Sequence, residues 1–581
     1  MIPLPQPPAT SVPPADPVSA QEWKWLALAV ILGSVVRLAF LDRVAVEHFD
    51  EGVYAANVWF GAEEGYQYPL RQFYAPPLLP TLIEWCYIAW SLTGMDAPAW
   101  LPMVPGLACG IATIPSAWWI ARRWFGPTAG YVAMWLVALN EFHAAYSRTA
   151  LTDVPVTLAI LWAVFAAWKL LLDPTVKNGL LTGAVTAIAW WLKYSGWLPL
   201  AILLVGGGVF QCFLRPEQRR WRAWAIATGV GILTAGLLWI PVYRDCLSVG
   251  GYSAIAANHR GYIMGWSAWW ANIVTHDHAF ARYCYQLTPL SFAAAVSVPF
   301  GGKTWVHMTR TNWIRIPVVI LAVAVFLFDP ATMFWGTFIF MALMGIACGV
   351  FENRRSTLPV PEVAACALAS TWFCGLLVTT PLYQPYPRLL VPWWMASTLL
   401  TTFVIGRLAS PGTAMQELRS SSGVPPIEWR RALMVGTLIV VIVVLDWPMS
   451  WAIPRKHDRL WEARDGFRKA ALSAADSLRA QSDAIAQVYG LPPVVIALRE
   501  RGVAAVVCGG PEAAARLDGS WLVVSSDAER DSTWNDHWPK VADQFELVST
   551  IPIQPSSIVR LDNGPMPADP PPVEVRLYRH R

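Results

Sequence analysis

Long apolar segments follow one another along most of this chain, and they limit its fold more than any other feature. A helix that crosses a bilayer needs roughly 20 predominantly apolar residues, and about thirteen segments come close to that length and composition. Charged residues make up only 14% of the chain, whereas soluble globular proteins carry about 25%. We therefore predict an α-helical polytopic membrane protein with about thirteen transmembrane helices.

The predicted spans are apolar throughout and are separated by polar loops. They are Trp23–Leu41, Leu101–Ala121, Gly126–Tyr146, Val154–Leu172, Gly179–Leu192, Gly196–Leu214, Trp221–Tyr243, Phe280–Phe300, Ile314–Phe328, Ala331–Phe351, Pro361–Thr380, Leu389–Leu408 and Ala432–Trp451. Pro76–Trp90 is also apolar, but it begins with two prolines and contains Glu84, so we predict a helix that lies at the membrane surface or dips into it. Arg37 falls inside the first span and is expected to face other helices rather than lipid.

Lys and Arg fall mainly in alternate loops, and this alternation predicts the orientation of the spans. Cytoplasmic loops are richer in these residues, and the basic loops here include Arg122–Arg123, Arg215–Arg222 and Arg354–Arg355. With an odd number of spans, the N-terminus lies inside and the C-terminus outside, provided that Pro76–Trp90 does not cross. We expect a multi-pass protein of the inner (plasma) membrane of the cell, with its active site and C-terminus extracytoplasmic.

The composition changes along the chain and divides it into three parts. Residues 1–22 are rich in proline and are predicted to form a disordered cytoplasmic N-terminus, and residues 23–451 form the transmembrane domain with its outer loops. Residues 452–581 have a charged, mixed composition that predicts a small extracytoplasmic α/β domain. Its expected elements are one amphipathic helix and three strands, namely Ala463–Gln481, Val494–Leu498, Val503–Cys508 and Trp521–Ser525.

Several kinds of partner leave no signature in the sequence. The net charge of +4 is small and dispersed, so we expect no nucleic-acid partner. The nine Cys form no C-x-x-C pair of the metal-binding kind and no phosphate-binding glycine motif is present, so we expect no resident metal or cofactor, although the sequence leaves a divalent metal open. Cys246 and Cys284 are placed on the outer side, and the sequence also leaves a disulfide between them open.

The acidic pair Asp50-Glu51 follows the first span almost at once and is the strongest candidate for chemistry. A carboxylate held beside a bilayer is costly because the charge loses its water. A carboxylate in such a place can accept a proton from a hydroxyl group. The structural alternative, in which Asp50 and Glu51 only cap a surface helix, stays open.

Further polar residues gather in the predicted outer loops, where cationic side chains could neutralise a departing phosphate. They are Arg148, Asp153, Lys193, His259, Arg260, Tyr386 and Arg388. Five of them have a structural alternative. Arg148 and Asp153 could form an ion pair, Lys193 could extend its charged end to the membrane interface, and His259 with Arg260 could be ordinary loop surface.

The order of four motifs resembles the membrane glycosyltransferases of the GT-C superfamily, and in particular the protein O-mannosyltransferase and lipid A aminoarabinose transferase group. The motifs are residues 49–55 (FDEGVYA), residues 74–79 (YAPPLL), residues 121–126 with 147–153 (ARRWFG and SRTALTD), and residues 386–392 (YPRLLVP). Two positions depart from the family pattern. Ala75 stands where the family has a basic residue before Pro-Pro, and Leu389 follows Arg388 where the family has Tyr.

The resemblance implies transfer of a sugar from a polyprenyl-phosphate donor to a glycan, lipid or protein acceptor at the outer face, with inversion of the anomeric centre. In that scheme Asp50 is the base, Glu51 supports it, and Asp153 orders the site. The leaving phosphate is stabilised by cationic side chains without need of a metal. The substrate-binding residues implied are Arg148, Lys193, His259, Arg260, Tyr386 and Arg388.

Two other classes of function compete with an enzyme. A transporter or flippase of a lipid-linked substrate would place its polar residues near the middle of the membrane and often shows internal repeats, whereas the polar residues here gather at one face and no repeat is visible. A non-catalytic membrane scaffold would tolerate the loss of Asp50.

Overall fold

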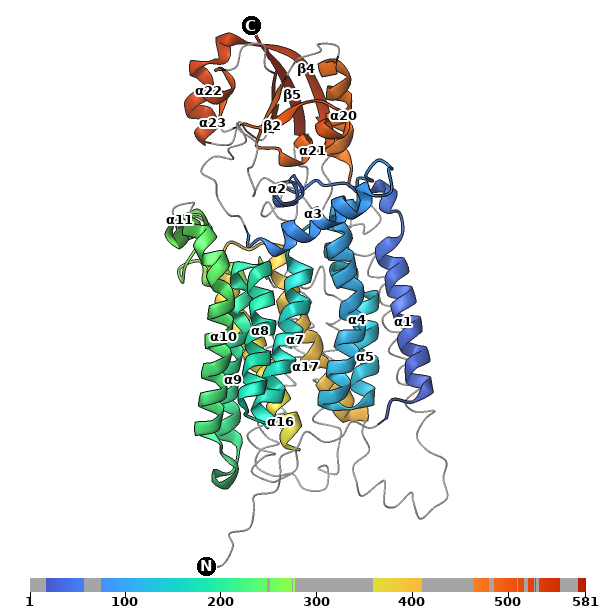
Figure 1. Ribbon diagram of the computed structural model, residues 1–581, viewed down its shortest axis with the longest axis vertical. Helices are drawn as coiled ribbons and strands as arrows, with labels where there is room; N and C mark the ends of the chain where they lie inside the picture. Colours follow the sequence, from blue (N-terminus) through green and yellow to red (C-terminus); the bar gives the residue numbers. More distant parts are fainter. Residues whose placement is uncertain are drawn as a thin grey trace, which may run out of the picture.

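A computed structural model shows a helical bundle with a smaller α/β domain beyond one of its ends (Figure 1). The structure describes residues 17–56, 75–247, 251–273, 275–276, 359–409, 463–479, 485–508, 510–516, 521–526, 528, 532–553 and 573–581. Nine long helices run along the bundle in these ranges. They are α1 (Ala20–Leu38), α4 (Val104–Phe125), α5 (Pro127–Leu139), α7 (Asp153–Leu172), α8 (Val176–Leu192), α9 (Leu198–Phe213), α10 (Trp221–Leu247), α16 (Val360–Thr379) and α17 (Leu390–Ala409).

Shorter elements connect the long helices at the end of the bundle nearest the C-terminal domain and at the opposite end. The α-helical ones are α2 (Phe49–Ala55), α3 (Leu78–Ser91), α6 (Glu141–Ser147) and α11 (Gly251–Arg260). The 3₁₀ turns are η1 (Leu41–Arg43), η2 (Leu101–Met103), η3 (Tyr194–Trp197), η4 (Pro216–Gln218), η6 (Thr380–Leu382) and η7 (Pro387–Leu389). Both kinds of element carry candidate site residues.

The helical polytopic class is confirmed. Six helices of the described ranges are long and apolar enough to cross a membrane, and each of the nine long helices overlaps a predicted span. Four predicted spans, Phe280–Phe300, Ile314–Phe328, Ala331–Phe351 and Ala432–Trp451, lie outside the described residues, so the number of about thirteen stays a prediction.

Pro76–Trp90, which was predicted not to cross the membrane, forms α3. This helix runs obliquely across the end of the bundle, between the bundle and the C-terminal domain (Figure 1). It packs on α2 and α4, while Trp85, Ile88 and Leu92 are exposed. An apolar outer face on a helix that lies across a bundle end suits the membrane interface, which agrees with the predicted surface helix.

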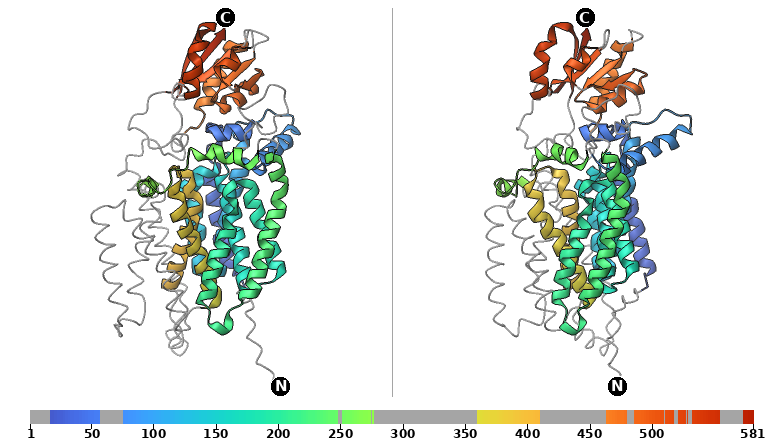
Figure 2. Two further views of the ribbon diagram at one scale, coloured as in Figure 1. Left: turned by 90° about the vertical axis from the view of Figure 1, so that its left-hand side faces the viewer. Right: turned by 60° about the vertical axis from the view of Figure 1, so that its left-hand side comes forward.

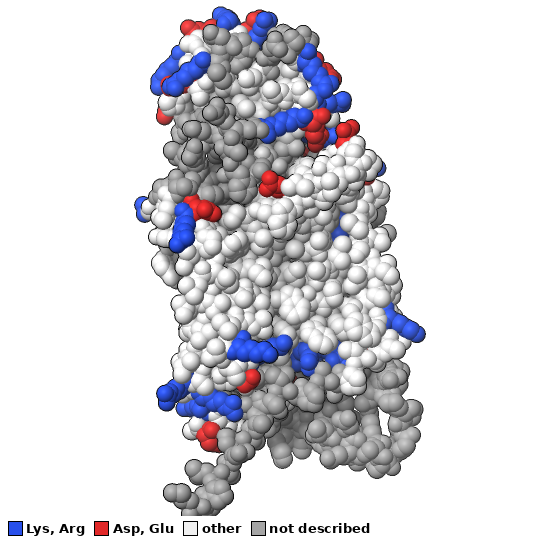
Figure 3. Space-filling model, in the orientation of Figure 1, with Lys and Arg blue, Asp and Glu red and all other residues white. Residues whose placement is uncertain are grey.

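Charged side chains avoid the middle of the bundle. Figure 3 shows an uncharged band between the C-terminal domain, where both signs of charge occur, and the opposite end of the bundle, where Lys and Arg predominate. Such a band, with basic residues at one border, is typical of a protein embedded in a bilayer.

Arg37 is the exception inside α1, and it faces other helices as predicted. Its side chain is fully buried, and its guanidinium donates to the carbonyl groups of Val137 and Ala138 at 2.8 and 3.0 Å and contacts Nδ1 of His143 at 2.9 Å. Val137 and Ala138 belong to the last turn of α5, where carbonyl groups lack helical partners and carry partial negative charge. Arg37 therefore caps α5.

Small residues bring the helices into close contact, as is common in membrane bundles. The views of Figure 2 place α16 and α17 along one side of the bundle, where they contact α9 and α7. The most intimate contact joins α8 to α10. A Cβ atom at Gly183 would collide with the carbonyl oxygen of Gly231 and lie 2.7 Å from Cβ of Thr234, so only glycine fits.

The C-terminal domain is built on one five-stranded sheet with the order β2-β1-β3-β5-β4. Strands β1 (Ala486–Tyr489), β2 (Ala505–Val507) and β3 (Trp521–Ser525) are parallel, and β5 (Val573–His580) is antiparallel to both β3 and β4 (Phe545–Ile553). The accompanying helices are α20 (Gly466–Arg479), α21 (Pro492–Glu500), α22 (Pro511–Ala514) and α23 (Ser532–His537), with 3₁₀ turns η9 (Trp538–Lys540) and η10 (Ala542–Gln544).

One predicted strand of this domain is wrong. Val494–Leu498 lies in α21, because Pro492 and Pro493 occupy the first helical positions, where proline is favoured. A short apolar run does not by itself distinguish a buried strand from a buried helix. The amphipathic helix corresponds to α20, and the strands predicted at Val503–Cys508 and Trp521–Ser525 correspond to β2 and β3.

We predict that Gly183→Ala lowers the stability of the bundle, since overpacking typically costs about 1–3 kcal/mol. Gly229→Ala is the matched control, because it lies on α10 with no atom within 4 Å of its would-be Cβ. Thermal unfolding of both variants in the same detergent would measure the difference. Equal melting temperatures for Gly183→Ala and the parent would contradict the packing of α8 on α10.

Candidate active site

The acidic pair begins a short helix, α2, whose first turn is organised by its own side chains. His48 caps the helix: its Nδ1 accepts a hydrogen bond from the backbone N–H of Asp50 at 3.1 Å. Oε2 of Glu51 accepts the N–H groups of His48 and Glu47 at 2.9 and 3.1 Å. Helix starts leave such N–H groups without helical partners, and a carboxylate there also suits the helix dipole.

Glu51 and Asp50 therefore have different environments although they are neighbours. The side chain of Glu51 is fully buried, and its second oxygen accepts the N–H of Ala150 at 2.9 Å, while Arg464 donates to Oε2 at 2.8 Å. Four hydrogen bonds thus hold this carboxylate. Glu51 therefore stabilises the start of α2, as the helix-capping alternative predicted for this residue. Its carboxylate is not placed to take a proton from a substrate.

Asp50 points away from this network and meets Arg388. Nη1 of Arg388 donates to Oδ2 of Asp50 at 2.6 Å, and the two side chains are 19% and 18% exposed. Arg388 lies on η7, immediately before α17, so the contact joins positions 338 residues apart. Both groups reach the surface, unlike the Glu51 pair, so a substrate can approach this carboxylate.

The charges around Asp50 keep it ionised. Burial alone would raise the pKa of this carboxyl, but the positive charge and the hydrogen bond of Arg388, with a smaller contribution from Lys193, outweigh it, and the pKa lies below its ordinary value. Asp50 is therefore a carboxylate at neutral pH. The pKa of the nearby Tyr54 hydroxyl is raised, first by burial and then by the negative charge of Asp50.

A second ion pair lies close by and connects α7 with the turn after α8. Nζ of Lys193 is 2.6 Å from Oδ1 of Asp153, whose side chain is almost completely buried, and the Lys193 side chain is 25% exposed. Asp153 begins α7. Asp153 thus pairs with Lys193 rather than with Arg148. The charge of Lys193 also contributes to the lowered pKa of Asp50, so the two ion pairs are taken together as one cluster.

Tyr386 lies beside Arg388, and two further tyrosines pack near its ring. The guanidinium lies 5.4 Å from the ring centre of Tyr386, and Tyr262 is 5.9 Å from both Tyr383 and Tyr386 between ring centres. Backbone contacts between the segment after α11 and the segment after α16 bring the tyrosines together, including the bridge of Ile263 with Tyr383. Tyr262 is 42% exposed. An aromatic surface beside a cation suits a sugar or lipid phosphate.

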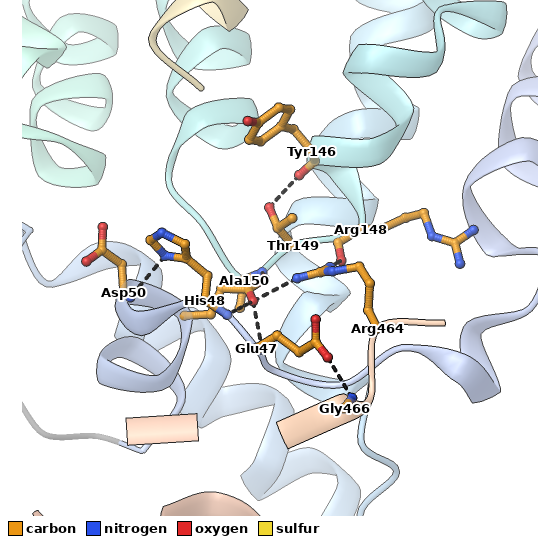
Figure 4. A network of polar contacts seen from close by, with 10 residues as sticks. Glu47, His48, Asp50, Tyr146, Arg148, Thr149, Ala150, Arg464 and Gly466 are labelled. Carbon is orange, nitrogen blue, oxygen red and sulfur yellow. Dashed lines mark hydrogen bonds and ion pairs between the residues drawn. The ribbon is translucent and has the colours of Figure 1, made fainter. Parts of the chain in front are cut away.

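The structure does not bring Arg148 into this cluster. Figure 4 shows its guanidinium directed away from Asp50, and it donates to the carbonyl groups of Ala39 and Phe40 at 2.7 and 3.4 Å. Phe40 has the left-handed φ of 54° that non-glycine residues rarely adopt. Burial first, and then the charge of Arg464, lower the pKa of Arg148 to about 10. Arg148 stabilises the turn that follows α1.

His259 and Arg260 lie at the end of α11, next to the cluster but not in its centre. The Nδ1 atom of His259 is 2.9 Å from the carbonyl oxygen of Ile255, and its ring is 6.1 Å from that of Tyr194. Arg260 is exposed. No group of three or more His, Cys, Asp or Glu side chains suited to a metal occurs in the part of the chain that the structure describes. The disulfide left open for Cys246 cannot be placed, since Cys284 lies outside that part.

Sequence reasoning missed Arg464. It lies in the C-terminal region, 413 residues from the carboxylate that it contacts, within a segment of ordinary mixed composition. No local pattern signals such a pairing. Its one indirect sign is Glu51 itself, a carboxylate beside a membrane that needs a cation when it is buried.

Comparison with known proteins bears on the fold of the chain. Residues 79–243 match the family model of the dolichyl-phosphate-mannose-protein mannosyltransferases. The fold is similar to that of the archaeal oligosaccharyltransferase AglB from Archaeoglobus fulgidus, solved with an inhibitory peptide and a dolichol-phosphate, with a TM-score of 0.50, 11% identity, and coverage of 91% of this chain and 73% of that one. The chain therefore has the fold of this oligosaccharyltransferase, and residues 79–243 resemble the mannosyltransferase family. These likenesses confirm the predicted resemblance to the GT-C superfamily.

A further match is ArnT from Cupriavidus metallidurans bound to undecaprenyl phosphate, at 15% identity and a TM-score of 0.40, over 96% of this chain and 98% of that one. No curated protein matches the sequence.

Proposed function

We propose that this chain is an integral-membrane glycosyltransferase that moves a sugar from a polyprenyl-phosphate donor to a hydroxyl-bearing acceptor at the extracytoplasmic face. The observation that carries the proposal is the partly exposed Asp50–Arg388 pair, with Lys193 close by, at the end of the bundle nearest the C-terminal domain. A base and a cation side by side are what displacement of a phosphate by a hydroxyl group requires. The family match over residues 79–243 supports a dolichyl- or other polyprenyl-phosphate donor.

The proposed mechanism is a single displacement that inverts the anomeric centre. The acceptor oxygen forms a bond to the anomeric carbon as the bond from that carbon to the phosphate oxygen breaks. Asp50 takes the proton of the acceptor hydroxyl, and the lipid phosphate leaves with the electron pair. Arg388 and Lys193 stabilise the negative charge on that phosphate. His259 and Arg260 are placed to contact the periphery of the donor or acceptor.

Asp153 positions Lys193 in this scheme, and the tyrosines near Arg388 contact the sugar. Tyr386 also bears on Arg388 through its ring. The location of the cluster at one end of the bundle favours an enzyme over a transporter, which would bind its substrate near the middle of the membrane. A pure scaffold has no need for a solvent-reachable carboxylate held ionised by Arg388 and Lys193.

We predict that Asp50→Asn lowers kcat by about 10²–10⁴-fold, because the amide cannot accept the acceptor proton. The control is Asp42→Asn, an exposed position on η1. Transfer from a panel of radiolabelled polyprenyl-phosphate sugars to membrane extract would be measured for purified parent and variants, with thermal unfolding as the check on folding. Parent-like turnover by a folded Asp50→Asn protein would exclude Asp50 as the base.

We predict that Arg388→Met shifts the acid limb of the pH–rate profile upward. Without Arg388, burial dominates and the pKa of Asp50 rises, so the carboxylate is lost at a higher pH than in the parent. A loss of phosphate binding would lower kcat/KM at every pH. It would not change the pH at which the acid limb lies. Lys193→Met should move the limb less, because Arg388 donates directly to Asp50 whereas Lys193 pairs with Asp153. If the acid limb of Arg388→Met stayed where it is in the parent, the limb would not report the ionisation of Asp50.

We predict that the C-terminus is extracytoplasmic. A reporter that works only outside the cytoplasm should therefore be active when it is fused after Arg581, and a reporter that works only in the cytoplasm should be inactive there. The basic end of the bundle lies opposite the C-terminal domain (Figure 3), and basic ends face the cytoplasm. Alkaline phosphatase and a cytoplasm-dependent fluorescent protein provide the two readouts. Signal from the cytoplasm-dependent reporter alone would invert the orientation and move the site to the other side.

A further inference from the structure

The entry of the chain into the C-terminal domain is paired with the first outer loop. Arg464 and Val44 form an isolated parallel bridge, in which the N–H of Arg464 donates to the carbonyl of Arg43 at 2.8 Å and the N–H of Ala45 donates to the carbonyl of Arg464 at 2.6 Å. The side chain of Arg464 is 4% exposed. The C-terminal domain therefore contributes a buried residue to the loop that carries the acidic pair.

The guanidinium of Arg464 joins two outer loops at once (Figure 4). Its Nη2 donates to Oε2 of Glu51 at 2.8 Å, and its Nη1 donates to the carbonyl of Arg148 at 2.7 Å. Glu51 in turn accepts the N–H of Ala150 from the second loop. The planar fork of arginine serves two acceptors in fixed directions, which the single ammonium of lysine does not reproduce.

Two more contacts hold α2 against the C-terminal domain. Oε1 of Glu47 accepts the N–H of Gly466, the first residue of α20, at 2.6 Å. Gly52 lies against Pro493 of α21 so closely that a Cβ atom there would be 2.5 Å from Cδ of that proline. The helix that carries Asp50 thus rests on the C-terminal domain as well as on the bundle.

We propose that Arg464 is a positioning residue for catalysis and that the C-terminal domain, through it, completes the active site. This inference rests on the proposed function of Asp50. Arg464 fixes Glu51, and Glu51 binds the N–H groups at the start of α2 and the second loop. Asp50 is the next residue along that first turn, so its carboxylate faces Arg388 only while this turn keeps its orientation. A misplacement of about 1 Å can cost a reaction about 100-fold.

The test compares Arg464→Met and Arg464→Lys with Arg468→Met. Arg468 is a matched control, because its ion pair with Glu500 joins α20 to α21 within the C-terminal domain. One readout is kcat and KM for donor. The other is hydrogen–deuterium exchange in residues 47–55 and 148–152, which reports the contacts of Arg464 and Glu51 with the two loops even if the protein is inactive. Thermal unfolding accompanies both.

We expect Arg464→Met to lower kcat by at least about tenfold with KM for donor changed less than about twofold, because Arg388 and Lys193 still bind the phosphate. Exchange of the His48 and Ala150 amides should rise at least about tenfold, the size of one lost charge-assisted hydrogen bond. Arg464→Lys should have a kcat and an exchange rate between those of Arg464→Met and the parent. In an Asp50→Asn background, Arg464→Met should lower the residual rate no further, while the exchange increase persists.

Parent-like kcat in Arg464→Met, or unchanged exchange in both segments, would overturn the proposal. An equal loss in Arg468→Met, or a further loss in the Asp50→Asn background, would also overturn it, because general destabilisation would then explain the effect. If the parent itself transfers no sugar from any donor, the transferase proposal fails. Exchange then still decides whether Arg464 organises the two loops, so the two failures are distinguishable.

Discussion

The end of the bundle nearest the C-terminal domain depends on one interaction, the buried carboxylate of Glu51 with its partners. A charge removed from water costs several kcal/mol unless hydrogen bonds and an opposite charge replace the lost solvent. Glu51 obtains three backbone N–H groups and the guanidinium of Arg464. These partners come from the first loop, the second loop and the start of the C-terminal domain. One side chain therefore joins three segments that are distant in the sequence.

Around this fixed point, the structure separates two carboxylates that are adjacent in sequence. Glu51 is sealed and structural, whereas Asp50 is partly exposed and faces Arg388. Removal of one partner from a buried ion pair typically costs about 3–5 kcal/mol, while a partly exposed pair can open to admit a substrate. The same division recurs with the two arginines: Arg148 stabilises the turn after α1, and Arg388 remains at the site.

The sequence predicted the helical bundle, because long apolar segments follow directly from the thickness of the bilayer. The motif at residues 49–55 indicated a candidate site, because a carboxylate beside lipid is costly. The sequence also proposed Arg388 and Lys193 as cations of the candidate site. The structure pairs Arg388 with Asp50 and pairs Lys193 with Asp153. The sequence predicted the surface helix α3 from two prolines and one glutamate.

Pairing partners could not be read in the same way. Arg148 and Asp153 are five positions apart and suggested an ion pair, yet tertiary packing gives Asp153 to Lys193 and directs Arg148 to backbone carbonyls. Arg464 lies far along the chain from its partners, and short segments such as Val494–Leu498 fit both a strand and a helix by pattern. Local patterns encode burial and periodicity, whereas these contacts depend on how distant segments meet.

The stereochemistry of transfer tests the central claim most directly. Purified protein would be given a polyprenyl-phosphate sugar of known anomeric configuration, and the product would be examined by proton NMR for the parent and for Asp50→Asn. A single displacement with Asp50 as base predicts a product of opposite configuration from the parent and almost none from Asp50→Asn. A product with retained configuration, or equal product from both proteins, would contradict the account.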